Sequence, residues 1–121
     1  LDYFKMKIFK DFTFEAAHRL TLVPESHKCF KLHGHSFKVQ ICVEGPVNNQ
    51  GWVIDFGEVK NICGPIINEL DHSYLNEIPG LENPTSENIS IWLWQKIKPT
   101  LPLLSSIEIK ETCNSSCLYS G

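Results

Sequence analysis

The sequence predicts an α+β protein in which two helices cover one face of a four-stranded antiparallel sheet. Two runs of alternating apolar residues come first, at about 5–17 and 33–46. Two stretches with helical spacing follow, and two further alternating runs end the chain. Strand side chains repeat every two residues, whereas an amphipathic helix repeats its apolar residues at i, i+3, i+4 and i+7. The order strand, strand, helix, helix, strand, strand favours helices segregated to one side of an antiparallel sheet.

Histidines mark the ends of the first two strands. The first run closes on His18, which shares the parity of Phe14 and Ala16. The second begins at His33 and His35, and their parity continues in an apolar series, before Gly-Pro ends the strand. Successive strand side chains point to opposite faces, so the two imidazoles of His-Gly-His lie on one side. Antiparallel pairing of these strands can bring His18 opposite that pair.

The first helix is predicted to begin at Asp55, with Glu58 three positions later as a capping partner. Its apolar positions follow the helical rule and are Val59, Ile62, Cys63, Ile66, Ile67 and Leu70. Pro65 lies inside this pattern, where it removes one backbone hydrogen bond. We expect it to kink or split the helix near Asn61.

The second helix is predicted to be capped by Thr85 or Ser86 and stopped by the prolines after it. The tail alternates again over 106–112, with Glu111 on the parity of two isoleucines, and 117–121 is predicted as a short last strand. A small sheet of this kind has exposed edges, which proteins cover, blunt or close into a barrel. Oligomerisation through those edges is one solution.

Composition bounds the class of protein. The 121 residues, 42% hydrophobic and 21% charged, suit one globular domain spanning 1–121. A net charge of −3 without a basic block argues against nucleic acid as the main partner. No segment has the pattern of a secretory signal or a membrane span. Five cysteines at irregular spacing indicate reduced thiols and a cytoplasmic protein.

The three histidines are the strongest chemical signal. A lone histidine at a strand end is usually exposed, or buried with a hydrogen bond. Jointly, His18, His33 and His35 on the core-facing parity favour a metal, because three imidazoles with an open fourth position describe a catalytic zinc site. His27 lies in a polar stretch without such parity, so we expect it to be exposed.

Four further residues could carry chemistry. Glu111 lies on the buried parity, so it needs either a cationic partner inside the fold or a ligand. Cys29, four residues before His33, is either an inert thiol or a base beside the metal. The dipeptide Asp71-His72 joins an acid to an imidazole, but by itself this is a weak signal.

Several motifs together resemble the 6-pyruvoyltetrahydropterin synthase family over essentially the whole chain. They are Phe14-Glu-Ala-Ala-His18-Arg-Leu, Cys29-x-x-x-His33-Gly-His35, Leu70-Asp71-His72, Asn83-Pro-Thr85-Ser86-Glu87-Asn88 and Glu111-Thr-Cys. Three residues between the cysteine and His-Gly-His resemble the 6-carboxytetrahydropterin synthases of bacterial queuosine biosynthesis. The biopterin-making branch typically has a longer gap there, and a third branch has Glu in place of the cysteine.

The resemblance implies the tunnelling fold (T-fold), in which sheets of neighbouring subunits join edge to edge into a barrel. The implied assembly is a homo-oligomer, commonly a hexamer built from two trimers, with its active site at a subunit interface. The implied zinc ligands are His18, His33 and His35. The implied catalytic residues are Cys29 as the base, with Asp71 and His72 reaching in from the adjacent subunit. The implied pterin-binding residues are Glu111, Thr85, Ser86 and Glu87.

The implied reaction converts 7,8-dihydroneopterin triphosphate and water to 6-carboxy-5,6,7,8-tetrahydropterin, acetaldehyde and triphosphate. Two alternatives remain open, namely 6-pyruvoyltetrahydropterin synthesis and a pterin- or purine-binding module without turnover. A zinc-dependent hydrolase ranks low, because no acidic residue lies beside the histidines to activate water. The residues that hold the triphosphate stay unassigned among Arg19, Lys28, Lys31 and Lys38.

Overall fold

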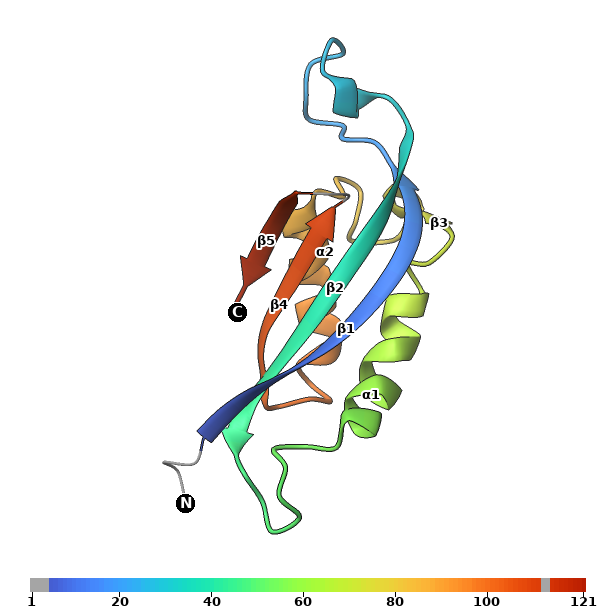
Figure 1. Ribbon diagram of the computed structural model, residues 1–121. Coiled ribbons are helices and arrows are strands. Elements are labelled where there is room, and N and C mark those ends of the chain that lie inside the picture. Colours follow the sequence, from blue (N-terminus) through green and yellow to red (C-terminus); the bar gives the residue numbers. More distant parts are fainter. Residues whose placement is uncertain (1–4, 112–113) are drawn as a thin grey trace.

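The sheet carries the histidines at one end and the helices on one face (Figure 1). The computed structural model describes residues 5–111 and 114–121. The strand order is β3-β1-β2-β4-β5. The strands are β1 (Lys5–His18), β2 (His33–Pro46), β3 (Ser73–Tyr74), β4 (Leu104–Glu111) and β5 (Ser115–Tyr119). Two short 3-10 turns, Lys28–Phe30 and Leu75–Glu77, lie between these elements.

The helices are α1 (Phe56–Asn68) and α2 (Ser86–Ile97), and in Figure 1 α2 lies behind the strands while α1 lies beside β1. Their buried residues and the inward-facing positions of β1, β2 and β4 form one apolar core. In this core Phe14 and Phe37, directly opposite each other in the β1–β2 register, stack with ring centroids 4.7 Å apart. Burial of apolar side chains is the main favourable contribution to folding. Here the packed Phe14 and Phe37 hold β1 and β2 together next to the histidines.

The predicted α+β class and the two helices on one face are confirmed, but the four-stranded antiparallel sheet was an incomplete prediction. The structure adds β3, a two-residue strand that runs parallel to β1 and makes the sheet mixed. Two residues carry no detectable alternation, so no sequence pattern could reveal this strand. Its pairing depends on tertiary placement: the N–H of His72 donates to the carbonyl of Glu15 at 2.6 Å, just before the paired residues.

The expected split of α1 near Asn61 is wrong, because the helix is continuous from Phe56 to Asn68 with Pro65 inside it, whereas the kink stays a prediction. Pro65 and Asn61 both lie on the exposed side of α1. Water can therefore solvate the Asn61 carbonyl that the proline leaves without its helical donor. Asp55 caps the helix as predicted, its side chain accepting from the N–H of Gly57 at 2.9 Å.

We expect Pro65→Ala to raise the free energy of unfolding by about 2 kcal/mol. Alanine restores the N–H donor to Asn61 and has a much better helix propensity, while the more flexible unfolded chain offsets part of the gain. Urea denaturation with a fitted m-value measures the change. Lys60→Ala, an exposed substitution on the same helix, is the control. An unchanged or lower midpoint for the Pro65 variant contradicts the prediction.

None of the helices among the described residues is both long and apolar enough to cross a membrane. The four cysteines that the structure describes are free thiols. Cys113 and Thr112, the last residue of the predicted 106–112 strand, lie outside the described residues.

Candidate functional site

The register of β1 and β2 brings three imidazoles together at one end of the sheet. His18 lies directly opposite His33, and His35 is paired with Ala16, one step along the same face. The ring centroids of the three histidines are 4.7, 5.1 and 4.7 Å apart. Their candidate ligand nitrogens all lie within 4.8 Å of one another. The convergence predicted from strand parity is therefore present in the fold.

Backbone carbonyls fix the orientation of two of these rings. The Nδ1 of His18 donates to the carbonyl of Pro84 at 2.8 Å, and the Nδ1 of His33 donates to the carbonyl of Lys31 at 2.6 Å. A carbonyl oxygen only accepts, so each Nδ1 carries a proton, and in the neutral ring Nε2 is then the nitrogen with the free lone pair. A hydrogen bond from the second ring nitrogen is the usual way that proteins orient a metal-binding histidine.

Burial supports the neutral, ligating form of His18. Its side chain is only 2% exposed, and burial lowers the pKa of the imidazole despite the opposing hydrogen bond to Pro84. Burial also lowers the pKa of His35, while the negative charge of Glu111 opposes that shift. The Nε2 of His18 is buried and has no hydrogen-bond partner among the described residues. Three nitrogen ligands, of which this atom is one, fit a divalent transition metal.

A hollow lies between the start of α2, the end of β4 and the start of β5, and the negative charge of Glu111 in its wall acts on His18 and His35. Glu111 pairs with Phe37, which puts its side chain on the helix-covered face as predicted. The hydroxyl of Ser86 donates to Glu111 Oε1 at 2.6 Å. All four predicted pterin-binding residues line this hollow, whose wall is made by Leu20, Thr85, Ser86, Glu87, Glu111, Ser115, Ser116 and Cys117.

The partner of Glu111 decides between its two predicted environments. Within the described part of the chain its hydrogen bond comes from a hydroxyl, not from a lysine or arginine. One lone-pair direction is thus satisfied, and the half-buried carboxylate still faces the hollow. An ionised carboxylate with remaining acceptor capacity suits a ligand that offers N–H groups.

Cys29 lies in the loop that projects beyond the ends of β1 and β2 (Figure 1). Its N–H donates to His27 Nδ1 at 3.0 Å, and its carbonyl accepts from the N–H of Leu20 at 2.8 Å. The backbone of Cys29 is therefore held on both sides, independently of its thiol. His27 is exposed, as predicted, and in addition it caps this short 3-10 turn.

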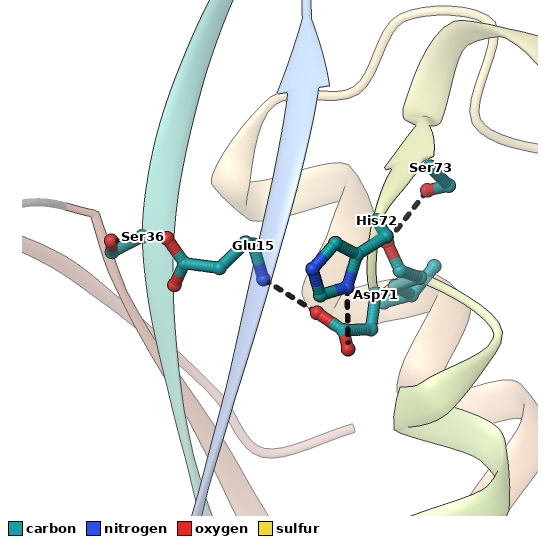
Figure 2. A network of polar contacts seen from close by, with 6 residues as sticks. Glu15, Ser36, Asp71, His72 and Ser73 are labelled. Carbon is teal, nitrogen blue, oxygen red and sulfur yellow. Dashed lines mark hydrogen bonds and ion pairs between the residues drawn. The ribbon is translucent and has the colours of Figure 1, made fainter.

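Asp71 and His72 come just before β3, at the β1 edge of the sheet. Figure 2 shows the pair beside Glu15 of β1, and His72 lines an open hollow along this edge that His35 also lines. Asp71 accepts from the N–H of Glu15 at 2.9 Å and from Nδ1 of His72 at 2.9 Å. The first of these bonds is the main cause that lowers the pKa of Asp71. With its side chain 81% exposed, His72 is presented outward from its own chain.

The acceptors that orient the histidines were missed by the sequence analysis. Main-chain carbonyls of Lys31 and Pro84 carry no sequence signature of their own. The sequence analysis recognised the side chain of His72 but not its backbone conformation. Among the described non-glycine residues, His72 has a positive φ of 57°. The left-handed conformation is uncommon for such a residue and is often found at functional sites.

The fold and the site together define a class. A sequence model described as 6-pyruvoyl tetrahydropterin synthase matches residues 7–121, nearly the whole chain. The protein belongs to the 6-pyruvoyl tetrahydropterin synthase family, and the predicted resemblance and enzyme class are confirmed. The structure of Caenorhabditis elegans 6-pyruvoyl tetrahydropterin synthase superposes with a TM-score of 0.89 at 25% identity, covering 97% of this chain and 96% of that one.

Relatives of this chain within the family are named for three different activities. A 6-carboxy-5,6,7,8-tetrahydropterin synthase of Synechocystis is 42% identical over 119 residues, covering 93% of this chain and 91% of its own length. A dihydroneopterin monophosphate aldolase of Pyrococcus furiosus is 37% identical over 98 residues, covering 81% and 80%. A 6-pyruvoyl tetrahydrobiopterin synthase of Drosophila melanogaster is 32% identical over 127 residues, covering 90% and 76%.

Proposed function

We propose that this protein is a zinc-dependent 6-carboxy-5,6,7,8-tetrahydropterin synthase of queuosine biosynthesis. Its substrates are 7,8-dihydroneopterin triphosphate and water, and its products are 6-carboxytetrahydropterin, acetaldehyde and triphosphate. The observation that carries the proposal is the cluster of His18, His33 and His35 beside a hollow that contains a half-buried carboxylate, Glu111. Three converging imidazoles, one with a buried nitrogen that has no partner among the described residues, favour a metal, and Zn²⁺ is the usual ion for three histidines with an open position.

Each residue of the site has a separate task in this proposal. His18, His33 and His35 hold the metal, which when bound acts as a Lewis acid toward the oxygens of the substrate side chain. The thiolate of Cys29 accepts the proton that leaves the substrate carbon. Glu111 accepts hydrogen bonds from the amino and ring N–H groups of the pterin, and the hydroxyl of Ser86 keeps that carboxylate oriented.

The choice within the family rests on the cysteine. Cys29 precedes His33 by four residues, the spacing that resembles the 6-carboxytetrahydropterin synthases, and the Synechocystis relative of that name covers most of the chain. The rivals are 6-pyruvoyltetrahydropterin synthesis, an aldolase acting on a monophosphate, as the name of the Pyrococcus relative suggests, and a pterin-binding module without turnover.

Product analysis separates these activities. We expect the zinc-loaded protein, incubated with 7,8-dihydroneopterin triphosphate, to release acetaldehyde and triphosphate in equal amounts. Triphosphate without acetaldehyde indicates the pyruvoyl product instead. Turnover of dihydroneopterin monophosphate but not of the triphosphate supports the aldolase, and substrate binding without any product in a single-turnover assay supports the binding module.

We propose that Asp71 and His72 act in the site of a neighbouring subunit of a homo-oligomer, with a hexamer of two trimers as the expected form. The exposure of the His72 side chain at the β3 edge of the sheet supports this assignment, because that imidazole is presented outward to a neighbour. The sheet also has edges that a neighbouring subunit can pair with, because β3 covers β1 only at Ala16 and Ala17. At the other edge, Leu118 of β5 is 65% exposed.

Mixed oligomers test whether the site is shared. Cys29→Ala and His72→Ala subunits, each inactive alone, are expected to regain part of the activity when unfolded together and reassembled. Recovery requires that one interface combines an intact cysteine from one subunit with an intact histidine from its neighbour. If the mixture stays as inactive as the separate variants, the residues act within a single chain. Size-exclusion chromatography with light scattering gives the number of subunits.

We expect Glu111→Gln to weaken pterin binding about 10- to 100-fold, because a hydrogen bond to a charged group contributes about 1.5–3 kcal/mol. Glutamine keeps the size and the acceptor for Ser86 but removes the negative charge. Fluorescence titration with a non-reactive pterin measures the Kd. Glu108→Gln, a carboxylate of opposite parity on the same strand, is the matched control. Equal affinities in the wild type and both variants refute the role given to Glu111.

A further inference from the structure

The turn before α2 is tied to the metal-site histidine through one peptide group. The carbonyl of Asn83 accepts from the N–H of Thr85 at 2.9 Å and from Nδ2 of Asn88 at 2.8 Å. Between them, the carbonyl of Pro84 accepts from Nδ1 of His18 at 2.8 Å. Both side-chain contacts are partly or fully buried. This turn, residues 83–85, is therefore held by a side chain from the first turn of the helix that follows.

The geometry points to Asn88 as a positioning residue of the metal centre, acting through Pro84 on His18. This inference rests on the proposed function, in which His18 binds the metal. The Pro84 carbonyl and the Thr85 N–H belong to one planar peptide group, so the direction of the first is set by the partner of the second. That partner is the Asn83 carbonyl, and the Asn88 amide anchors it.

The Asn88 anchor matters on the Asn83 side of the turn. Thr85 is held separately, because its Oγ1 accepts from the N–H of Asn88 at 3.1 Å and its carbonyl from the N–H of Ile89 at 2.9 Å. A bond from the N–H of Thr85 to the carbonyl two residues earlier closes a three-residue γ-turn, and proline supplies no N–H of its own to steady it. Without the Asn88 donor, the peptide after Pro84 can rotate and release Nδ1 of His18. The proton of a neutral imidazole can then move to Nε2, and that tautomer has no lone pair there for a metal.

We expect Asn88→Ala to weaken metal binding about 10-fold, the lower end of the range for residues that orient a metal ligand. Asn88→Asp is the near-isosteric second variant, which places an acceptor against the Asn83 carbonyl and acts in the same direction. Gln95→Ala removes an exposed amide from the same helix and is the matched control. Competition of the metal-free protein with a chromophoric chelator for Zn²⁺ or Co²⁺ gives the affinities.

Long-range ¹H–¹⁵N NMR of the metal-free protein gives a second readout, independent of metal and activity. The wild type and Gln95→Ala should show His18 as the Nδ1–H tautomer, and both Asn88 variants should show a larger Nε2–H population. A purely structural role for Asn88 would lower the thermal unfolding temperature of the metal-free protein without changing tautomer or relative affinity.

The experimental outcomes distinguish failure of the Asn88 positioning role from failure of the proposed metal-dependent function. If the wild type binds metal tightly and both Asn88 variants match it in affinity and tautomer, the positioning role is wrong and the proposed function stands. If the wild type binds neither Zn²⁺ nor Co²⁺, the metal-dependent function fails, and the inference fails with it. Weaker binding together with the shifted tautomer, in variants whose circular dichroism is unchanged, supports the inference.

Discussion

Cys29→Ala is expected to reduce turnover about 10²- to 10⁴-fold, the usual contribution of a general base, while zinc content stays unchanged. Alanine has no group that can accept a proton. The loop should keep its shape, because Cys29 is held by its own backbone bonds to His27 and Leu20. Steady-state kinetics and metal analysis of the same preparation measure the two quantities side by side.

Two further variants sharpen this test. Cys29→Ser should also be slow, because a hydroxyl is a much weaker acid than a thiol and is scarcely ionised near neutral pH. Cys63→Ala removes a thiol from the core, where burial raises the pKa of that cysteine to about 12, and it should keep most of its turnover. If zinc leaves together with the Cys29 thiol, that residue is a metal ligand, and the role proposed for it is wrong.

His18→Ala is expected to weaken zinc binding by more than about 100-fold, because altering even a residue that merely orients a ligand costs about 10- to 100-fold. The substitution removes the buried nitrogen that has no partner in the described protein and leaves two ligands on β2. Turnover should be lost with the metal. Calorimetric titration of the metal-free protein gives the affinity and the stoichiometry.

The control for this variant is His27→Ala, which removes an exposed imidazole from the loop before β2. It should bind zinc with wild-type affinity. Thermal unfolding of the metal-free His18 variant shows whether its fold is retained, since His18 is buried against Phe37 with ring centroids 5.5 Å apart. A folded His18→Ala protein that still binds one zinc tightly refutes the three-histidine site.

The histidine cluster was predictable because strand parity is a local property. Alternation alone put His18 on one face of its strand and His33 with His35 on one face of the next. The remaining step, pairing the strands in register, follows from burying the apolar residues of both on the same side. The same argument put Glu111 on the helix-covered face, although its hydroxyl partner Ser86 comes from an element 25 residues away.

Other parts of the site depend on contacts between distant segments. The position of Asp71 and His72 is set by hydrogen bonds to the main chain of Glu15, 56 residues before Asp71. The proton on His18 is placed by the carbonyl of Pro84, 66 residues away. Main-chain groups are the same at every position, so no residue pattern could predict which carbonyl or N–H would form a hydrogen bond with a given side chain.

By itself, the sequence determined the α+β class, the helix-covered face, the three imidazoles and the carboxylate of the candidate pocket, because each follows from local periodicity or from the chemistry of a side chain. Only the tertiary structure decided the fifth strand, the continuity of α1 through Pro65 and the placement of Asp71 and His72 against Glu15. These features depend on solvent exposure and on main-chain hydrogen bonds between segments far apart in the chain, which exist only once the core has packed.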